Sequence, residues 1–455
     1  MLSAGNENPS EREGGLRRSL GKAQIVMIGL GGAIGTGLFM GSSLAVGYAG
    51  PAVIVSYALA GYVALVMVFS LSEMAVVHPT AGSFGVYAEM YLNSWAGFVV
   101  RYTYWIAQVI AVGGESVAAG LYMQYWFPGV PVWAWALGFC MVMLYLNSRS
   151  VANFGTVESW LAVIKVATIV VFIILGIASV AGIGRPAVGL HNLTGLPGGF
   201  LPKGVTGLWM AVTVGIFSFV GIEVIAVTSG ETQNPEVAIP AALRTMLLRL
   251  FLFYVLAVAV IVAIAPWTDI GAKVVAQSPF VTVLRHSGIR DAAGIMNFVV
   301  VSAALSSMNT DVYLCSRMLF SLSRGGDAPR ALGRLSDRGS PVAAILVSGV
   351  FVLVASGASI FTPDAYADLL GVALFAMIIV WMLVLASHLS FRRRHAAATL
   401  PVRMPLFPWV QYAGLAMLAA VLVTMGLDSR LDVSWLYGVP WIALISLIYF
   451  VRRKG

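Results

Sequence analysis

The stretch GLGGAIGTGLFMG, residues 29–41, carries six glycines in thirteen positions and lies inside an apolar run long enough to cross a bilayer. A glycine inside a helix costs about 0.5–1 kcal/mol relative to alanine. Helix is nearly the only backbone that lipid permits, and non-helical backbone at membrane depth survives only against protein or a water-filled cavity. The stretch therefore predicts a broken membrane helix with a site beside it.

Composition places the whole chain in a membrane. Of its 455 residues, 59% are hydrophobic and 10% are charged, and the mean hydropathy is +0.90, far above that of soluble domains. The apolar runs do not alternate in polarity as barrel strands do, so we expect an all-α integral membrane protein. Twelve transmembrane helices are predicted, at residues 24–47, 51–77, 96–120, 131–148, 158–181, 205–228, 247–266, 292–320, 342–361, 365–389, 407–427 and 434–451.

The basic residues indicate an orientation. With the polar N-terminal tail, residues 1–23, in the cytoplasm, 20 of the 27 Lys and Arg residues fall on the cytoplasmic side. The tail lacks the cleavage site of a signal peptide. We expect a multi-pass protein of the cytoplasmic (inner) membrane with both termini inside, embedded in the lipid bilayer. The positive charge then reflects orientation and requires no nucleic acid partner.

Cysteine and histidine give no sign of metal or cofactor chemistry. Cys140 and Cys315 fall inside predicted spans, which argues against a disulfide framework. The five histidines lack metal-ligand spacing, and no nucleophile and base are paired. We expect no metal, no cofactor and no enzymatic activity.

A second interrupted span gives the chain a weak internal symmetry. Residues 217–223 (FSFVGIE) break span 6 with a glycine and an acid, five spans after the first break. Interrupted spans at corresponding places in two halves indicate a transporter's binding site, and five spans per half give the halves opposite topology. The predicted divisions are the tail at 1–23, a first five-helix repeat at 24–181, a second inverted repeat at 205–389, and two peripheral C-terminal helices at 407–451.

The first break predicts a binding site for a carboxylate. At Gly35, Thr36 and Gly37 a new helix begins, and its free N–H groups and positive dipole end favour an anion. The alternative is close helix packing, because Gly31 and Gly35 satisfy Gly-x-x-x-Gly, as do Gly37 and Gly41. A dinucleotide fingerprint is excluded because its third glycine position is isoleucine.

The second break predicts a binding site for an ammonium group. An interruption would free carbonyl groups at the end of the first half of span 6, and the two breaks together would receive an α-amino acid. An ordinary kink is the alternative, and the two aromatic side chains either line the pocket or pack elsewhere. The candidate residues here are Phe217, Ser218, Phe219, Val220 and Gly221.

Three ionisable residues are candidates for coupling transport to an ion, because charges inside membranes are costly and usually functional. Lys165 is placed to carry a proton or to replace a sodium ion, or else snorkels to the interface. Asp311 pairs with Lys165 or takes up a proton, or else is the structural partner of Arg317. Glu223 titrates, or else braces the break in span 6. Glu115, late in span 3, is expected near the outer vestibule.

These residues resemble those of the amino acid–polyamine–organocation superfamily, in the branch of bacterial aromatic, lysine, proline and GABA permeases. The resemblance covers nearly the whole chain. Its motifs are Gly31–Phe39, Glu73 with Pro79–Phe84, Phe154-Gly155 with Glu158 and Lys165, Phe217–Glu223, Glu231 with Asn234-Pro235 and Ile239-Pro240, and Ser316–Phe320. Asp311 departs from the pattern, since a small residue is usual there.

The resemblance implies a LeuT-type 5+5 inverted repeat plus two C-terminal helices. It implies that amides of Thr36 and Gly37 bind the substrate carboxylate, and that carbonyls of Ala33, Phe217 and Val220 bind its ammonium group. Lys165 would stand where sodium sits in sodium-coupled relatives. Residues 119–128 are most similar to aromatic permeases.

The function predicted is secondary active import of an α-amino acid, neutral or aromatic by preference, with a proton and by alternating access. Two alternatives stay open: an amino acid or amine exchanger without net proton coupling, and a membrane amino-acid sensor that does not transport.

Overall fold

The computed structural model describes residues 16, 18–149, 151–183, 186–270, 280, 284, 292–362, 364–395, 400, 402–428 and 431–454. Throughout these residues the chain is helical, and its one β-type pairing is an isolated bridge between Leu20 and Thr232. The helices of the first part are α1 (Lys22–Ala33), α2 (Thr36–Phe39), α3 (Gly41–Ala49), α4 (Val53–Val77), α5 (Ser83–Tyr91), α6 (Ser94–Met123), α7 (Val132–Arg149), α8 (Val151–Ala181) and α9 (His191–Thr194).

The later part continues the helical pattern. Its helices are α10 (Gly204–Ser218), α11 (Val224–Thr228), α12 (Pro235–Phe251), α13 (Ala257–Ile264), α14 (Trp267–Ile270), α16 (Ala292–Arg324), α17 (Val342–Ser356), α18 (Ala365–Arg394), α19 (Trp409–Leu427) and α20 (Val433–Lys454). Eight helical segments of the described chain are long and apolar enough to cross a membrane. The prediction of an all-α multi-pass membrane protein is thereby confirmed, whereas the count of twelve spans and the inverted repeat stay predictions.

Both helix breaks expected from the sequence are present. The first apolar run is helical to Ala33 and resumes as α2 at Thr36, and the sixth ends at Ser218 and resumes as α11 at Val224. Within the second break Gly221 has a φ of +102°, a backbone conformation that a side chain disfavours. These two breaks create the irregular backbone around which the site is built.

The segment after α11 departs from the prediction. The seventh span was expected to begin at residue 247, but α12 begins at Pro235. Proline suits the first position of a helix because its missing N–H would have no partner there. From α12 the chain passes through a π-helical turn, Leu252–Leu256, into α13, so this helical segment is longer than hydropathy alone indicated.

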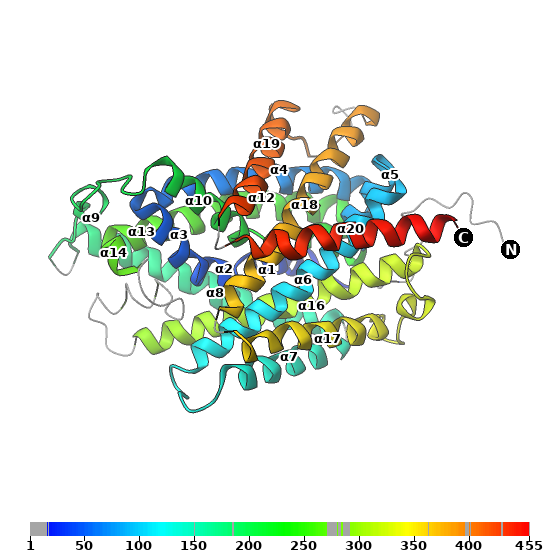
Figure 1. Cartoon of the computed structure of the whole chain (residues 1–455), viewed down its shortest axis with the longest axis horizontal. Helices are drawn as coiled ribbons and strands as arrows, with labels where there is room; N and C mark the ends of the chain where they lie inside the picture. Colours follow the sequence, from blue (N-terminus) through cyan, green and yellow to red (C-terminus); the bar gives the residue numbers. More distant parts are fainter. Residues whose placement is uncertain are drawn as a thin grey trace.

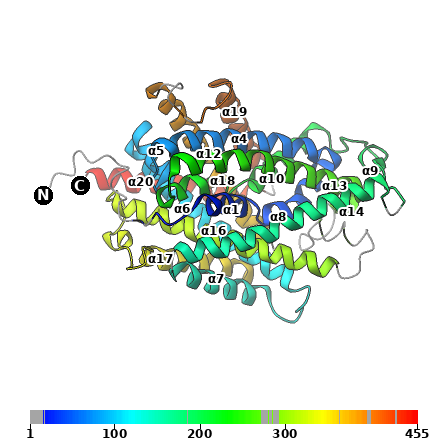
Figure 2. The same ribbon diagram turned by 180° about the vertical axis from the view of Figure 1, so that it is seen from behind.

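The broken helix α1 lies in the interior of the molecule. It packs against α8, α12 and α16, as the view from behind shows (Figure 2). Helices α6 and α16 pack along each other through the centre, and α18 packs on α6 (Figure 1). Helix α10 packs on α3 and α4. The two breaks are thus surrounded by long helices, and the middles of α6 and α16 supply polar side chains to them.

Candidate functional site

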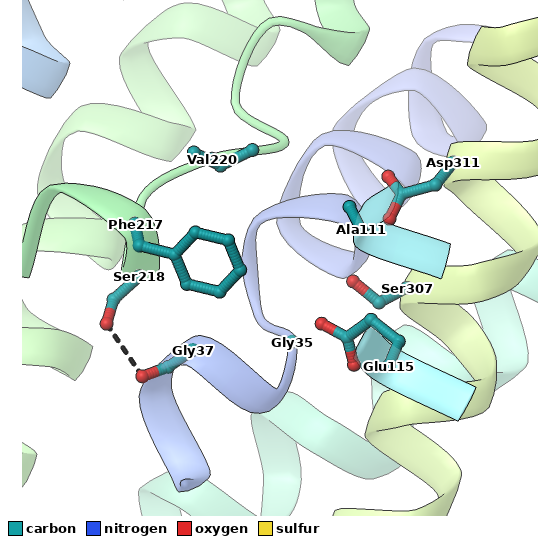
Figure 3. Close-up of a pocket in the computed structure, with 9 residues that line it drawn as sticks. All are labelled: Gly35, Gly37, Ala111, Glu115, Phe217, Ser218, Val220, Ser307 and Asp311. Carbon is teal, nitrogen blue, oxygen red and sulfur yellow. Dashed lines mark hydrogen bonds between the residues drawn. The ribbon is translucent and has the colours of Figure 1, made fainter. Parts of the chain in front are cut away.

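A small cavity lies where the two helix breaks face α6 and α16 (Figure 3). Its volume is about 20 Å³, room for about one water molecule. The residues that line it are Gly35, Gly37, Ala111, Glu115, Phe217, Ser218, Val220, Ser307 and Asp311. The cavity is therefore closed to anything as large as an amino acid in this conformation.

Each wall of the cavity comes from a different element. The first break supplies two glycines and the second supplies Phe217, Ser218 and Val220. Helices α6 and α16 each contribute two residues four positions apart, a spacing that puts both on one helix face. Six of the residues singled out from the sequence meet here, while Ala111, Glu115 and Ser307 were missed as lining residues.

Glu115 lies at the start of α2. Both of its carboxylate oxygens accept the backbone N–H of Thr36, at 3.2 and 3.3 Å. A carboxylate is the group that a helix N-terminus attracts. Glu115 thus occupies the amide predicted for the substrate carboxylate and lines the cavity between the breaks, while its expected location near the outer vestibule stays a prediction. The available signal was an acid inside a predicted span.

A hydrogen bond joins the two breaks across the cavity. Ser218 donates from Oγ to the carbonyl oxygen of Gly37 at 2.7 Å, the dashed line in Figure 3, and the hydroxyls of Ser218 and Tyr57 lie 3.0 Å apart. A Cβ placed on Gly37 would lie 2.9 Å from Cα of Ser218. The glycine therefore serves close packing of the two breaks as well as access to the cavity.

Glu223 forms hydrogen bonds that hold the second break in place. It accepts the N–H of Gly221 at 3.1 Å and the hydroxyl of Tyr104 at 3.1 Å. These contacts match the bracing role considered for it. Gly221 itself does not line the cavity.

Phe219 lies apart from the cavity. Its ring stacks on that of Tyr254, with centroids 4.4 Å apart, so it packs in the core and Phe217 alone of the two aromatics lines the cavity. Ala33 is the last residue of α1, and the surroundings of its side chain lie outside the described part of the chain.

Lys165 supports the end of α1. Its ammonium is fully buried and donates to the carbonyl oxygens of Gly31 and, at 2.8 Å, Ile34. The final carbonyls of a helix have no partner within it, and a cation is favoured there. Burial rules out the snorkelling interpretation in this conformation.

An ion pair extends the contacts of Lys165 to α16. Its Nζ lies 4.0 Å from Oε1 of Glu158. Ser306 donates a hydrogen bond to Oε1 of Glu158, and Asn309 donates one to Oε2 at 3.2 Å. A Cβ on Gly31 would overlap Glu158, so the glycine is needed for this approach. The network ties α1, α8 and α16 together.

Asp311 points into the cavity from α16 and is 5% exposed. The structural role considered for it, pairing with Arg317, is not found, because Arg317 binds Glu231 at 3.0 Å. The ion pair considered between Asp311 and Lys165 is not found either, because Lys165 pairs with Glu158.

The described residues contain no group of three or more His, Cys, Asp or Glu side chains placed to hold a metal ion. Cys140 and Cys315 are both buried and both free thiols.

A buried polar site between two interrupted helices of a multi-pass membrane protein is the arrangement of secondary transporters. The sequence places the chain more narrowly. It matches the amino acid permease family over residues 24–455, and the chain belongs to that family.

Named relatives support the assignment. The chain is 38% identical to the gamma-aminobutyric acid permease of Bacillus subtilis (strain 168), over 98% of this chain and 96% of the relative. It is also 38% identical to the aromatic amino acid transport protein AroP of Escherichia coli (strain K12), over 96% of each chain. Such proteins are transporters, not enzymes, as expected from the sequence.

Proposed function

We propose that this permease imports an amino acid together with a proton by alternating access. The observation that carries the proposal is the cavity in which two helix breaks meet buried carboxylates, next to the Lys165 network. Backbone amides and carbonyls suit the two charged groups that amino acids share. We place the protein in the cytoplasmic membrane with both termini inside, on the asymmetry of its basic residues.

In this proposal the substrate carboxylate binds at the amides of Thr36 and Gly37, and its ammonium group binds carbonyls of Ala33, Phe217 and Val220. The contact between Glu115 and Thr36 adds a requirement, because the substrate carboxylate and Glu115 compete for one amide. Binding therefore requires Glu115 to move, and the small cavity, which Phe217 helps to line, must widen.

The coupling role is assigned first to Lys165. A charged ammonium holds the carbonyls of Gly31 and Ile34, and a neutral amine would hold them less strongly, since hydrogen bonds from charged donors are about twice as strong. Loss of the proton would thus loosen the end of α1 next to the cavity. Glu223, at the second break, and Asp311, in the cavity wall, are the further candidates for proton uptake.

Uptake into proteoliposomes tests the proposal. An imposed inward proton gradient, with no amino acid inside, should drive accumulation of a labelled amino acid above its equilibrium level. Absolute dependence on internal substrate would favour an exchanger, and binding without flux would favour a sensor. The substrates tested should include aromatic amino acids and gamma-aminobutyric acid, because the names of the relatives specify them.

A further inference from the structure

Asp311 is an acid in the cavity wall, and Lys165, the cation that attracts it electrostatically, forms its ion pair with Glu158 instead. Its side chain is 95% buried, given its 5% exposure, and points into the cavity with no hydrogen bond to the other lining residues (Figure 3). None of the ion pairs found in the described part of the chain includes it. A buried carboxylate left without a partner is costly, so such groups in membrane proteins usually face a ligand or an ion path.

The buried cations nearby have other partners. Lys165 pairs with Glu158 at 4.0 Å and donates to the end of α1, and Arg317 pairs with Glu231 at 3.0 Å. The second acid of the cavity, Glu115, already has the amide of Thr36 as its donor. Asp311 is thus the carboxylate of this cavity that has no ion pair and no hydrogen bond among the described residues, so a cationic group of the substrate can become its direct partner.

The position of Asp311 relative to the breaks indicates which part of a substrate it meets. Phe217 and Val220 lie on one side of the cavity, and Asp311 lies on the other, one helical turn from Ser307 on α16 (Figure 3). The α-carboxylate and α-ammonium of an amino acid, bound by the breaks, would leave its side chain to extend toward α16.

We propose that Asp311 binds a positively charged group on the substrate side chain, so that the permease selects cationic amino acids such as lysine or ornithine. The inference rests on the proposed function, because it assumes that the helix breaks hold the α-groups. It replaces the preference for a neutral or aromatic side chain, which was drawn from residues 119–128; none of these lines the cavity.

Lysine and norleucine provide a matched pair of ligands, since norleucine has a methyl group in place of the terminal aminomethyl group of lysine. Thermal shift of the purified full-length permease at neutral pH gives the affinity for each. We expect lysine to bind at least about tenfold more tightly, because its ammonium group can form a charge-assisted hydrogen bond with Asp311 and the methyl group of norleucine cannot. Asp311→Asn should lower the affinity for lysine by about tenfold and change that for norleucine by less than about twofold.

Asp337→Asn is the control, because Asp337 is exposed in the loop between α16 and α17. Equal or tighter binding of norleucine by the unmodified protein would overturn the inference, as would an equal loss of both ligands in Asp311→Asn. Asp311→Ser serves as a second variant, and the comparison with unmodified protein decides the matter even if neither variant folds. Proton-driven uptake of neutral amino acids alone would overturn this inference and leave the proposed function intact, whereas absence of any amino acid uptake would overturn the proposed function.

Discussion

The carboxylate of Glu115 on α6 accepts the backbone N–H of Thr36 at the first residue of α2. The contact joins residues 79 positions apart and fills the amide to which a substrate carboxylate is assigned. In this conformation the protein therefore supplies its own anion to the helix N-terminus. Under the proposed function, substrate entry replaces one carboxylate by another.

Glu115→Gln should raise the affinity for the amino acid substrate severalfold. The amide oxygen of glutamine still accepts the N–H of Thr36, but it is a weaker acceptor and does not repel the incoming carboxylate. Thermal shift against the substrate and against its decarboxylated amine measures the effect. The amine should gain no affinity from this mechanism, and an unchanged or lower affinity for the amino acid would contradict competition at Thr36.

Lys165→Ala should abolish proton-driven accumulation. It leaves the carbonyls of Gly31 and Ile34 and the carboxylate of Glu158 without their cation, each at a cost of about 1–3 kcal/mol or more. Uptake over a range of external pH is the measurement. Lys203→Ala, at the exposed N-terminal end of α10, is the matched control and should behave as the unmodified protein does. Survival of accumulation and of its pH dependence in Lys165→Ala would exclude the coupling role.

Gly37→Ala and Gly41→Ala separate the inner glycines from the outer ones. A Cβ on Gly37 would lie 2.9 Å from Cα of Ser218, whereas a Cβ on Gly41 would find its nearest neighbour at 3.7 Å, an ordinary contact. We expect Gly37→Ala to lose substrate binding and Gly41→Ala to retain it. The affinity of each variant for the substrate is measured by thermal shift, and the expression level of each variant shows whether it folds. Equal binding by both variants would remove the argument that the first break holds the substrate.

The helix breaks could be predicted because their cause is local. Glycines 29–41 and the sequence FSFVGIE interrupt apolar runs, and the preference of lipid for helix makes any such interruption conspicuous. The long helices follow from hydropathy in the same way. The start of α12 at Pro235 did not follow from hydropathy, because a proline after turn residues suits both a loop and the first turn of a helix.

The lining of the cavity could be predicted only in part, because it depends on how distant helices rotate against each other. Ser307 and Ala111 became lining residues through the packing of α16 against α6, which no local pattern specifies. Phe217 and Phe219, two positions apart, differ in surroundings because the chain turns between them: one lines the cavity and the other stacks on Tyr254.

Gly221→Ala tests whether the second break depends on its glycine. The φ of +102° at Gly221 is one that alanine disfavours, and its N–H donates to Glu223 at 3.1 Å, which fixes the backbone in that conformation. We expect a loss of about 1–3 kcal/mol in stability or a shift of the break that weakens substrate binding. Gly114→Ala is the control, because Gly114 lies within α6 and a Cβ there would meet only Leu369, at 3.7 Å. Gly221→Ala could instead have the same melting temperature and substrate affinity as the unmodified protein. That result would show that the break does not require the glycine conformation, and Glu223 would then be its principal support.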